Sequence, residues 1–147
     1  MKKRTYLFSF ILLLNITVFA QKPDDICKTW LTGKKEAKIK IEKGIDGKYN
    51  GKIVWLKTPN NPDGTPKVDK ENPDKEKRKN PIMGLPLLKG FEYKSGNVWE
   101  NGTIYDPESG KTYSCVIKLT SEGNLDVRGY VGFSWIGRTD TWTASSE

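Results

Sequence analysis

The chain has 147 residues and carries 25 Lys and Arg against 18 Asp and Glu, a formal charge of +7. That length suits one domain with one core. The chain contains no histidine, which excludes Ser-His-Asp and Cys-His catalysis and zinc sites built on imidazole. We therefore expect no enzyme, no metal site and no cofactor.

Residues 1–20 have the pattern of an export signal. A positively charged start is followed by an apolar stretch over residues 6–19, and small residues precede a cut before Gln21. The stretch is shorter than the about 20 apolar residues of a spanning helix. We expect cleavage, which leaves residues 21–147 as one periplasmic or secreted domain without a transmembrane segment. Losing three cations lowers the charge to +4, too little for a nucleic-acid-binding footprint.

Cys27 and Cys115 are the two cysteines of the chain. An even number of cysteines in an exported protein favours a disulfide. The bridge would place the first strand beside the strand that carries Cys115. The alternative is two free thiols that pack as small hydrophobic side chains.

Alternation of apolar and polar residues predicts an all-β domain. A first strand is expected near Trp30, and the turn signal Asp46-Gly47 predicts a hairpin between the next two strands. Further strands are expected over residues 37–42, 48–56, 90–94, 97–105, 111–120, 124–133 and 136–143. Seven or eight antiparallel strands in so small a domain predict a closed, calycin-like barrel, because closure removes exposed edges.

The connection over residues 57–80 breaks this pattern. Its first part is rich in Pro, Asn and Gly and predicts an irregular loop. Asn72 as N-cap and Pro73 at the first helical position then predict one short helix, which Pro81 ends. The apolar residues 82–90 are expected to fold against the body of the domain.

Four residues, Pro107-Glu-Ser-Gly110, predict the turn of another hairpin. Pro107 presets the first turn residue, and Gly110 can take the left-handed conformation. Asp106 and Glu108 also resemble the carboxylate pair of a glycosidase. Turn chemistry accounts for both carboxylates, so we expect no catalytic role for them.

Motifs along almost the whole mature chain resemble the exported bacterial proteins of the domain of unknown function 2147 family (DUF2147). The matching motifs are Trp30-Leu-Thr32, Gly51-Lys-Ile-Val-Trp-Leu56, Asp63-Gly-Thr-Pro-Lys67, Asp69-Lys-Glu-Asn-Pro-Asp74, Pro81-Ile-Met-Gly-Leu85, Gly102-Thr-Ile-Tyr-Asp-Pro107, Val127-Arg-Gly-Tyr-Val-Gly132, and Arg138 with Thr141-Trp-Thr143. The resemblance implies an exported single β domain and implies no activity.

A looser similarity connects the chain to lipocalin-like small barrels. In those barrels a Trp of the first strand packs near a late basic residue. Trp30 and Arg138 would fill these places through a cation–π contact. The chain lacks the glycine that usually precedes this Trp.

The leading functional hypothesis is non-catalytic binding of a small hydrophobic or amphipathic, lipid-like and anionic ligand by a monomeric barrel. Aromatic side chains would supply contact area, and an arginine would orient the acidic group. The predicted ligand-binding residues are Trp55, Trp99, Tyr105, Tyr113, Arg128 and Arg138. The alternative is an envelope interaction module with a solid barrel, whose 57–90 loop docks a protein partner. Ligand binding inside the barrel needs a cavity of roughly a few hundred cubic ångströms lined by these aromatic residues, and a filled interior would rule it out.

Overall fold

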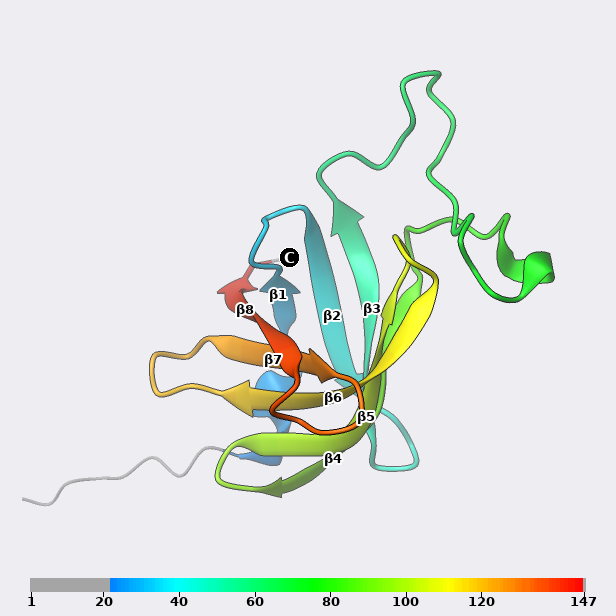
Figure 1. The fold of residues 1–147 in the computed structure, drawn as a ribbon. Coiled ribbons are helices and arrows are strands. Elements are labelled where there is room, and N and C mark those ends of the chain that lie inside the picture. Colours follow the sequence, from blue (N-terminus) through cyan, green and yellow to red (C-terminus); the bar gives the residue numbers. More distant parts are fainter. Residues whose placement is uncertain (1–21, 147) are drawn as a thin grey trace, which may run out of the picture.

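A computed structural model describes residues 22–146, so the predicted export signal lies outside the described residues. Eight antiparallel strands form a closed barrel in which each strand pairs with its neighbours in the sequence (Figure 1). The strands are β1 (Thr29–Leu31), β2 (Ala37–Lys43), β3 (Tyr49–Leu56), β4 (Pro86–Ser95), β5 (Val98–Asp106), β6 (Lys111–Leu119), β7 (Leu125–Tyr130) and β8 (Gly137–Ser145). The predicted all-β barrel is confirmed.

The short strand β1 closes the barrel. Its Trp30 lies opposite Ile39 of β2 on one side and opposite Ala144 of β8 on the other. Since β1 has only three residues, the first half of β8 (residues 137–141) continues beyond this pairing without a β1 partner. The end of the barrel that contains this half of β8 is called the open end below.

The opposite, closed end is covered by a 3-10 turn, η1 (Pro23–Ile26). Ile26 is fully buried, and its carbonyl accepts a hydrogen bond of 2.9 Å from the Trp30 indole. Large inward-facing side chains fill this half of the barrel, each at most 2% exposed: Trp30, Tyr49, Phe91, Trp99 and Trp142. The aromatic residues therefore serve mainly as core.

Glycines on the inner face make room for these rings. A Cβ atom at Gly102 would lie only 2.4–2.5 Å from three ring carbons of Phe91. Gly51 similarly faces Leu88 and Ile39, and the β3–β4 register shifts beside it. A glycine inside a strand often marks an irregularity of this kind.

Residues 57–85 form an arm that extends away from the barrel (Figure 1). Isolated bridges join Asn60 to Pro66 and Val68 to Pro81. The short helix expected here is a single 3-10 turn, η2 (Lys75–Lys77), with Asp74 rather than Asn72 as its N-cap. The Asn72 carboxamide instead accepts a hydrogen bond from the backbone N–H of Asp74, which delays the helical turn.

The apolar segment over residues 82–90, which begins at the base of the arm, divides between two roles. Ile82 and Leu85 pack against the core, as expected for this segment. Residues from Pro86 onward already belong to β4.

The predicted disulfide is not present, because Cys27 and Cys115 are both free thiols. Cys27 follows η1 beside the end of β2, where it interacts with the Lys43 backbone. Cys115 lies on β6, between β5 and β7, and so belongs to another part of the barrel wall. Burial raises the pKa of the Cys115 thiol to about 12, so this thiol is kept protonated.

Candidate functional site

The six predicted ligand-binding residues do not form one group. Trp99 is fully buried in the filled half of the barrel, with its ring centroid 5.3 Å from that of Tyr93 and 6.2 Å from that of Tyr49. Its indole nitrogen has no hydrogen-bond partner among the described residues. Trp99 therefore contributes packing and is not available to a ligand from solution.

Trp55 lies on the outer face of β3. Strict alternation along the predicted 48–56 strand would put Trp55 on the inner face with Tyr49 and Ile53, and in the structure this alternation breaks. A register shift in the β2–β3 pairing turns Trp55 opposite Lys38, and the lysine ammonium lies 5.9 Å from the Trp55 ring centroid. Trp55 is 38% exposed.

Tyr105 also faces outward, where it anchors the arm. Its hydroxyl donates a hydrogen bond of 2.8 Å to Asp69, and Asn72 donates another of 2.6 Å to the same fully buried carboxylate. Burial, followed by the hydrogen bond and charge of Asp69, raises the pKa of Tyr105 to about 12. At Gly110 a Cβ atom would overlap the carbonyl oxygen of Glu71, which shows how closely the arm meets the β5–β6 turn.

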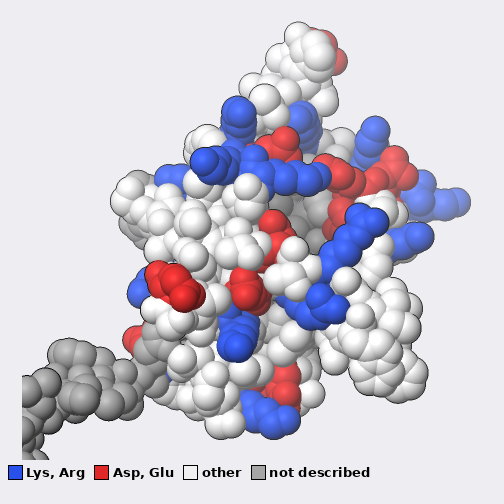
Figure 2. All heavy atoms as spheres, turned by 60° about the vertical axis from the view of Figure 1, so that its left-hand side comes forward, with Lys and Arg blue, Asp and Glu red and all other residues white. Residues whose placement is uncertain are grey.

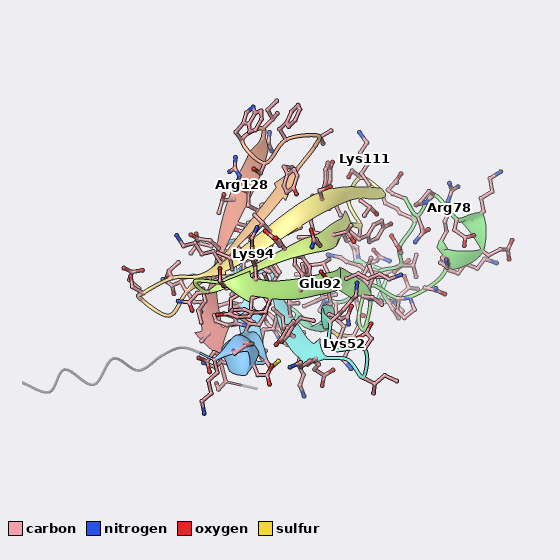
Figure 3. All side chains as sticks on the ribbon, turned by 90° about the horizontal axis from the view of Figure 1, so that it is seen from below. Lys52, Arg78, Glu92, Lys94, Lys111 and Arg128 are labelled. Carbon is pink, nitrogen blue, oxygen red and sulfur yellow. The ribbon has the colours of Figure 1, made fainter. Side chains whose placement is uncertain are left out.

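Arg128 lies on the outer face of β7 and supports the following turn (Figure 3). Its Nε donates 2.6 Å to the carbonyl oxygen of Ser134, and its Nη1 donates 3.0 Å to the Thr139 hydroxyl. Two structural hydrogen bonds thus occupy the guanidinium.

Tyr113 and Arg138 share the inner face at the open end. Arg138 lies opposite Gly129, which lies opposite the buried Cys115, so all three face inward. A Cβ atom at Gly129 would contact Ile104 at 3.3 Å and Tyr113 at 3.8 Å, which places these side chains over the glycine. Ile104 and Tyr113 are half-buried, while Arg138 is exposed.

Asp140 supplies a negative charge next to Arg138 along the same face of β8. It lies opposite the buried Val127 and yet remains exposed, because β1 does not extend along this part of β8. Its Oδ2 accepts hydrogen bonds from the Trp142 indole at 2.7 Å and from the backbone N–H of Gly33 at 3.3 Å. The carboxylate thereby connects the exposed rim to the buried core.

The expected Trp30–Arg138 contact is absent from the described residues. The cation–π pairs there are Lys38 with Trp55 and Lys43 with Tyr49. Trp30 is fully buried and donates to Ile26 instead, whereas Arg138 lies at the other end of the barrel.

Two hollows open to solvent lie at hairpin ends. One, of about 450 Å³, lies between the β2–β3 turn and β4. Its lysines are held in ion pairs: Lys43 lies 3.0 Å from Asp24, and Lys48 lies 2.7 Å from Glu92. The Tyr49 and Lys43 hydrogen bonds lower the pKa of Asp24. The other, of about 630 Å³, lies between the β4–β5 and β6–β7 turns. None of the six predicted ligand-binding residues lines either hollow.

Catalytic and metal chemistry find little support in these side chains. The Asp106 carboxylate accepts hydrogen bonds from the Glu108 N–H and the Ser109 hydroxyl, as expected for turn chemistry. No cluster of three potential metal ligands occurs among residues 22–146. Acidic and basic side chains are interspersed on the face shown in Figure 2, so no single-sign field marks a site there.

The sequence pattern missed an exposed apolar turn between β7 and β8. Alternation along the predicted 124–133 strand would put Val131 and Phe133 on its inner face, but β7 ends at Tyr130. Four large apolar side chains of this turn are exposed: Val131, Phe133, Trp135 and Ile136. The glycines on either side of Phe133-Ser-Trp-Ile136 were the available signal for a turn.

Comparison with known proteins decides the family. The model of a family described as an uncharacterized protein conserved in bacteria (DUF2147) matches residues 28–144. The chain belongs to the DUF2147 family. The match covers most of the barrel of this DUF2147 protein, from just before β1 into β8.

A solved structure has the same fold as this DUF2147 protein. It is described as protein HP1028 from the human pathogen Helicobacter pylori, which belongs to the lipocalin family. The TM-score is 0.70 at 22% identity, over 83% of this chain and 84% of that chain. No curated protein matches this DUF2147 chain. Within residues 22–146, no helix is long and apolar enough to cross a membrane.

Proposed function

We propose that this protein is an exported, monomeric, non-catalytic binding protein that holds a small amphipathic, anionic ligand at the open end of its barrel. One observation carries the proposal: on β5, β6 and β8 the inner face changes from buried toward the closed end to partly or fully exposed at the open end, whereas Leu88 of β4, opposite Ile104, stays buried. Ile104 and Tyr113 keep partly exposed apolar surface there, beside the exposed cation of Arg138. Apolar walls with a few polar groups are typical of ligand sites.

The filled half of the barrel sets the size of that ligand. Trp30, Trp99 and Trp142 are each at most 2% exposed, so an acyl chain of a ligand cannot contact them. A ligand therefore contacts the inner face only from Tyr113 outward. We expect a short acyl or aromatic acid rather than a long lipid enclosed in the barrel.

Fluorescence titration with an anionic short-chain fatty-acid analogue and its uncharged methyl ester tests this function. Arg138→Gln is expected to weaken binding of the acid about fivefold and to leave the ester unchanged, since an exposed ion pair contributes about 1 kcal/mol. Lys94→Gln is the matched control, because Lys94 pairs with Glu100 on the outer face. Equal affinity of the acid for the Arg138→Gln variant and the parent protein, or no binding of either probe, refutes the proposal.

A protein partner that docks on the arm is the second candidate function. The favouring observation is the buried Asp69 anchor, which holds a long and mostly exposed segment in one conformation. Such ordering lowers the entropy lost on binding. Cross-linking in the host from a reactive residue placed at Lys67, with one at Lys118 as control, is expected to capture a single partner. Identical products from the two positions count against this function.

Export is tested separately by fractionation of the host. We expect the protein in the periplasmic or extracellular fraction. Its measured mass should equal that of the chain cleaved before Gln21. A cytoplasmic protein that retains residues 1–20 contradicts it.

A further inference from the structure

The β7–β8 turn, residues 131–136, exposes four large apolar side chains to solvent. Val131 is 67% exposed, Phe133 60%, Trp135 72% and Ile136 60%. In Figure 3 this turn forms an edge of the molecule beyond Arg128. Exposed apolar clusters of this kind mark interaction surfaces.

The apolar side chains are held in place by the turn itself. The rings of Phe133 and Trp135 stack in parallel, with centroids 4.5 Å apart and planes at 7°. Backbone hydrogen bonds run from Ile136 to Phe133 and from Phe133 to Val131, and the Arg128 side chain holds the Ser134 carbonyl. The rings are therefore presented outward before any partner arrives.

The charged residues nearest the tip of the turn in the sequence are cations, and the exposed carboxylate of Asp140 lies beyond Arg138 on β8. Residues 127–139 include Arg128 and Arg138 and no Asp or Glu. The carboxylates on either side, Asp126 and Asp140, accept hydrogen bonds from Thr141 and from Trp142 respectively. An anionic partner would therefore meet cations and aromatic rings at this edge.

We propose that residues 131–136 dock the protein on an anionic phospholipid surface, with Phe133 and Trp135 entering the headgroup region. Trp combines a large apolar ring with a polar N–H and is enriched at this depth of a bilayer. Each cation near an anionic membrane strengthens binding about fivefold.

A second protein chain fits this turn less well than a bilayer does. A stable protein interface uses about 20–30 residues on each side, whereas this turn is a protruding segment of six. A lipid headgroup layer deforms around a protruding tip and needs no complementary groove. Arg138 is shared with the proposed ligand site, but the docking proposal rests on Phe133 and Trp135, and the variants that test it keep Arg138, so either proposal can fail alone.

Vesicle sedimentation tests the proposal, with phosphatidylglycerol/phosphatidylcholine vesicles compared with phosphatidylcholine alone. The protein is purified as the cell produces it, and all variants share the same N-terminus, so residues 1–20 contribute equally. The parent protein is expected to bind the anionic vesicles and to dissociate as salt rises. Phe133→Ser/Trp135→Ser is expected to lower the partition coefficient at least tenfold.

Ile45→Ser is the matched control, because Ile45 is a fully exposed apolar residue on the β2–β3 turn. It should bind like the parent protein. Brominated lipids add a second measurement: they should quench tryptophan fluorescence in the parent and much less in Trp135→Phe, which keeps an aromatic ring at the tip. Near-ultraviolet circular dichroism checks that each variant is folded.

Unchanged vesicle binding by the double variant overturns the proposal, as does quenching that persists in Trp135→Phe. A parent protein that ignores anionic vesicles also overturns it. If sedimentation equilibrium then shows a dimer that the double variant loses, the turn is a self-association surface instead.

Discussion

Replacement of Gly102 by alanine tests the packing of the closed end. The added Cβ atom would lie 2.4–2.5 Å from Cγ, Cδ1 and Cδ2 of Phe91, about 1 Å inside ordinary contact. These atoms lie at the base of a fully buried ring, so the ring cannot simply swing aside. Overpacking of this kind costs about 1–3 kcal/mol.

Alanine also lowers the conformational entropy of the unfolded chain relative to glycine. This stabilises the folded state by about 0.4–1 kcal/mol and offsets part of the packing cost. The expected net loss is therefore about 1–2 kcal/mol, which lowers the melting temperature of a domain of this size by about 4–8 °C. Calorimetry and urea unfolding measure the two quantities independently.

Gly129→Ala is the matched control, since it makes the same change on the inner face of another strand. Its Cβ atom would meet Ile104 at 3.3 Å, which a small shift relieves, so we expect stability within about 0.5 kcal/mol of the parent. Phe91→Leu should reduce the penalty at Gly102, because the two positions are in contact. Equal stability of Gly102→Ala and Gly129→Ala would refute the packing described here.

Tyr105→Phe should destabilise the protein by about 1–2 kcal/mol near neutral pH, measured by urea unfolding, since the buried Asp69 loses a hydrogen bond. The pKa of Tyr105 is raised from 10 to about 12, so its contribution is fully present below pH 10 and is lost as pH rises through 12. The difference between parent and Tyr105→Phe should therefore shrink between pH 9 and pH 12; a constant difference contradicts this coupling. Alkylation in urea without reductant should add two labels, at Cys27 and Cys115, and no added mass would establish a disulfide. In the folded protein Cys115 should react slowest, because burial keeps its thiol protonated.

The sequence predicts the hairpin turns well because their chemistry is local. Gly47 and Gly110 take the positive φ values that their turn motifs require, 78° and 68°. Apolar alternation between such turns is enough to predict a closed barrel, because each strand pairs with its neighbours in the chain.

The candidate site was less predictable, because a shift of one residue reverses the face of a strand. Trp55 turned outward at such a shift in the β2–β3 pairing. Phe133 left the predicted face because Gly132, with φ of 71°, and the turn hydrogen bonds end β7 early. Of the predicted ligand-binding residues, Tyr113 and Arg138 reach the inner face at the open end.

The three-residue strand β1 also determines when the barrel can close during folding. The last strand, β8, must be complete before Leu31 can pair with Thr143 and close the wall. Until then the chain is an open sheet with two unpaired edges, which other chains can join. The adjacency of β1 and β8 also makes the domain a candidate for circular permutation, with a linker between the natural ends and new termini at the exposed β2–β3 turn. In such a permutant β8 and β1 would be neighbours in the chain. Their pairing would then no longer join the first strand made to the last.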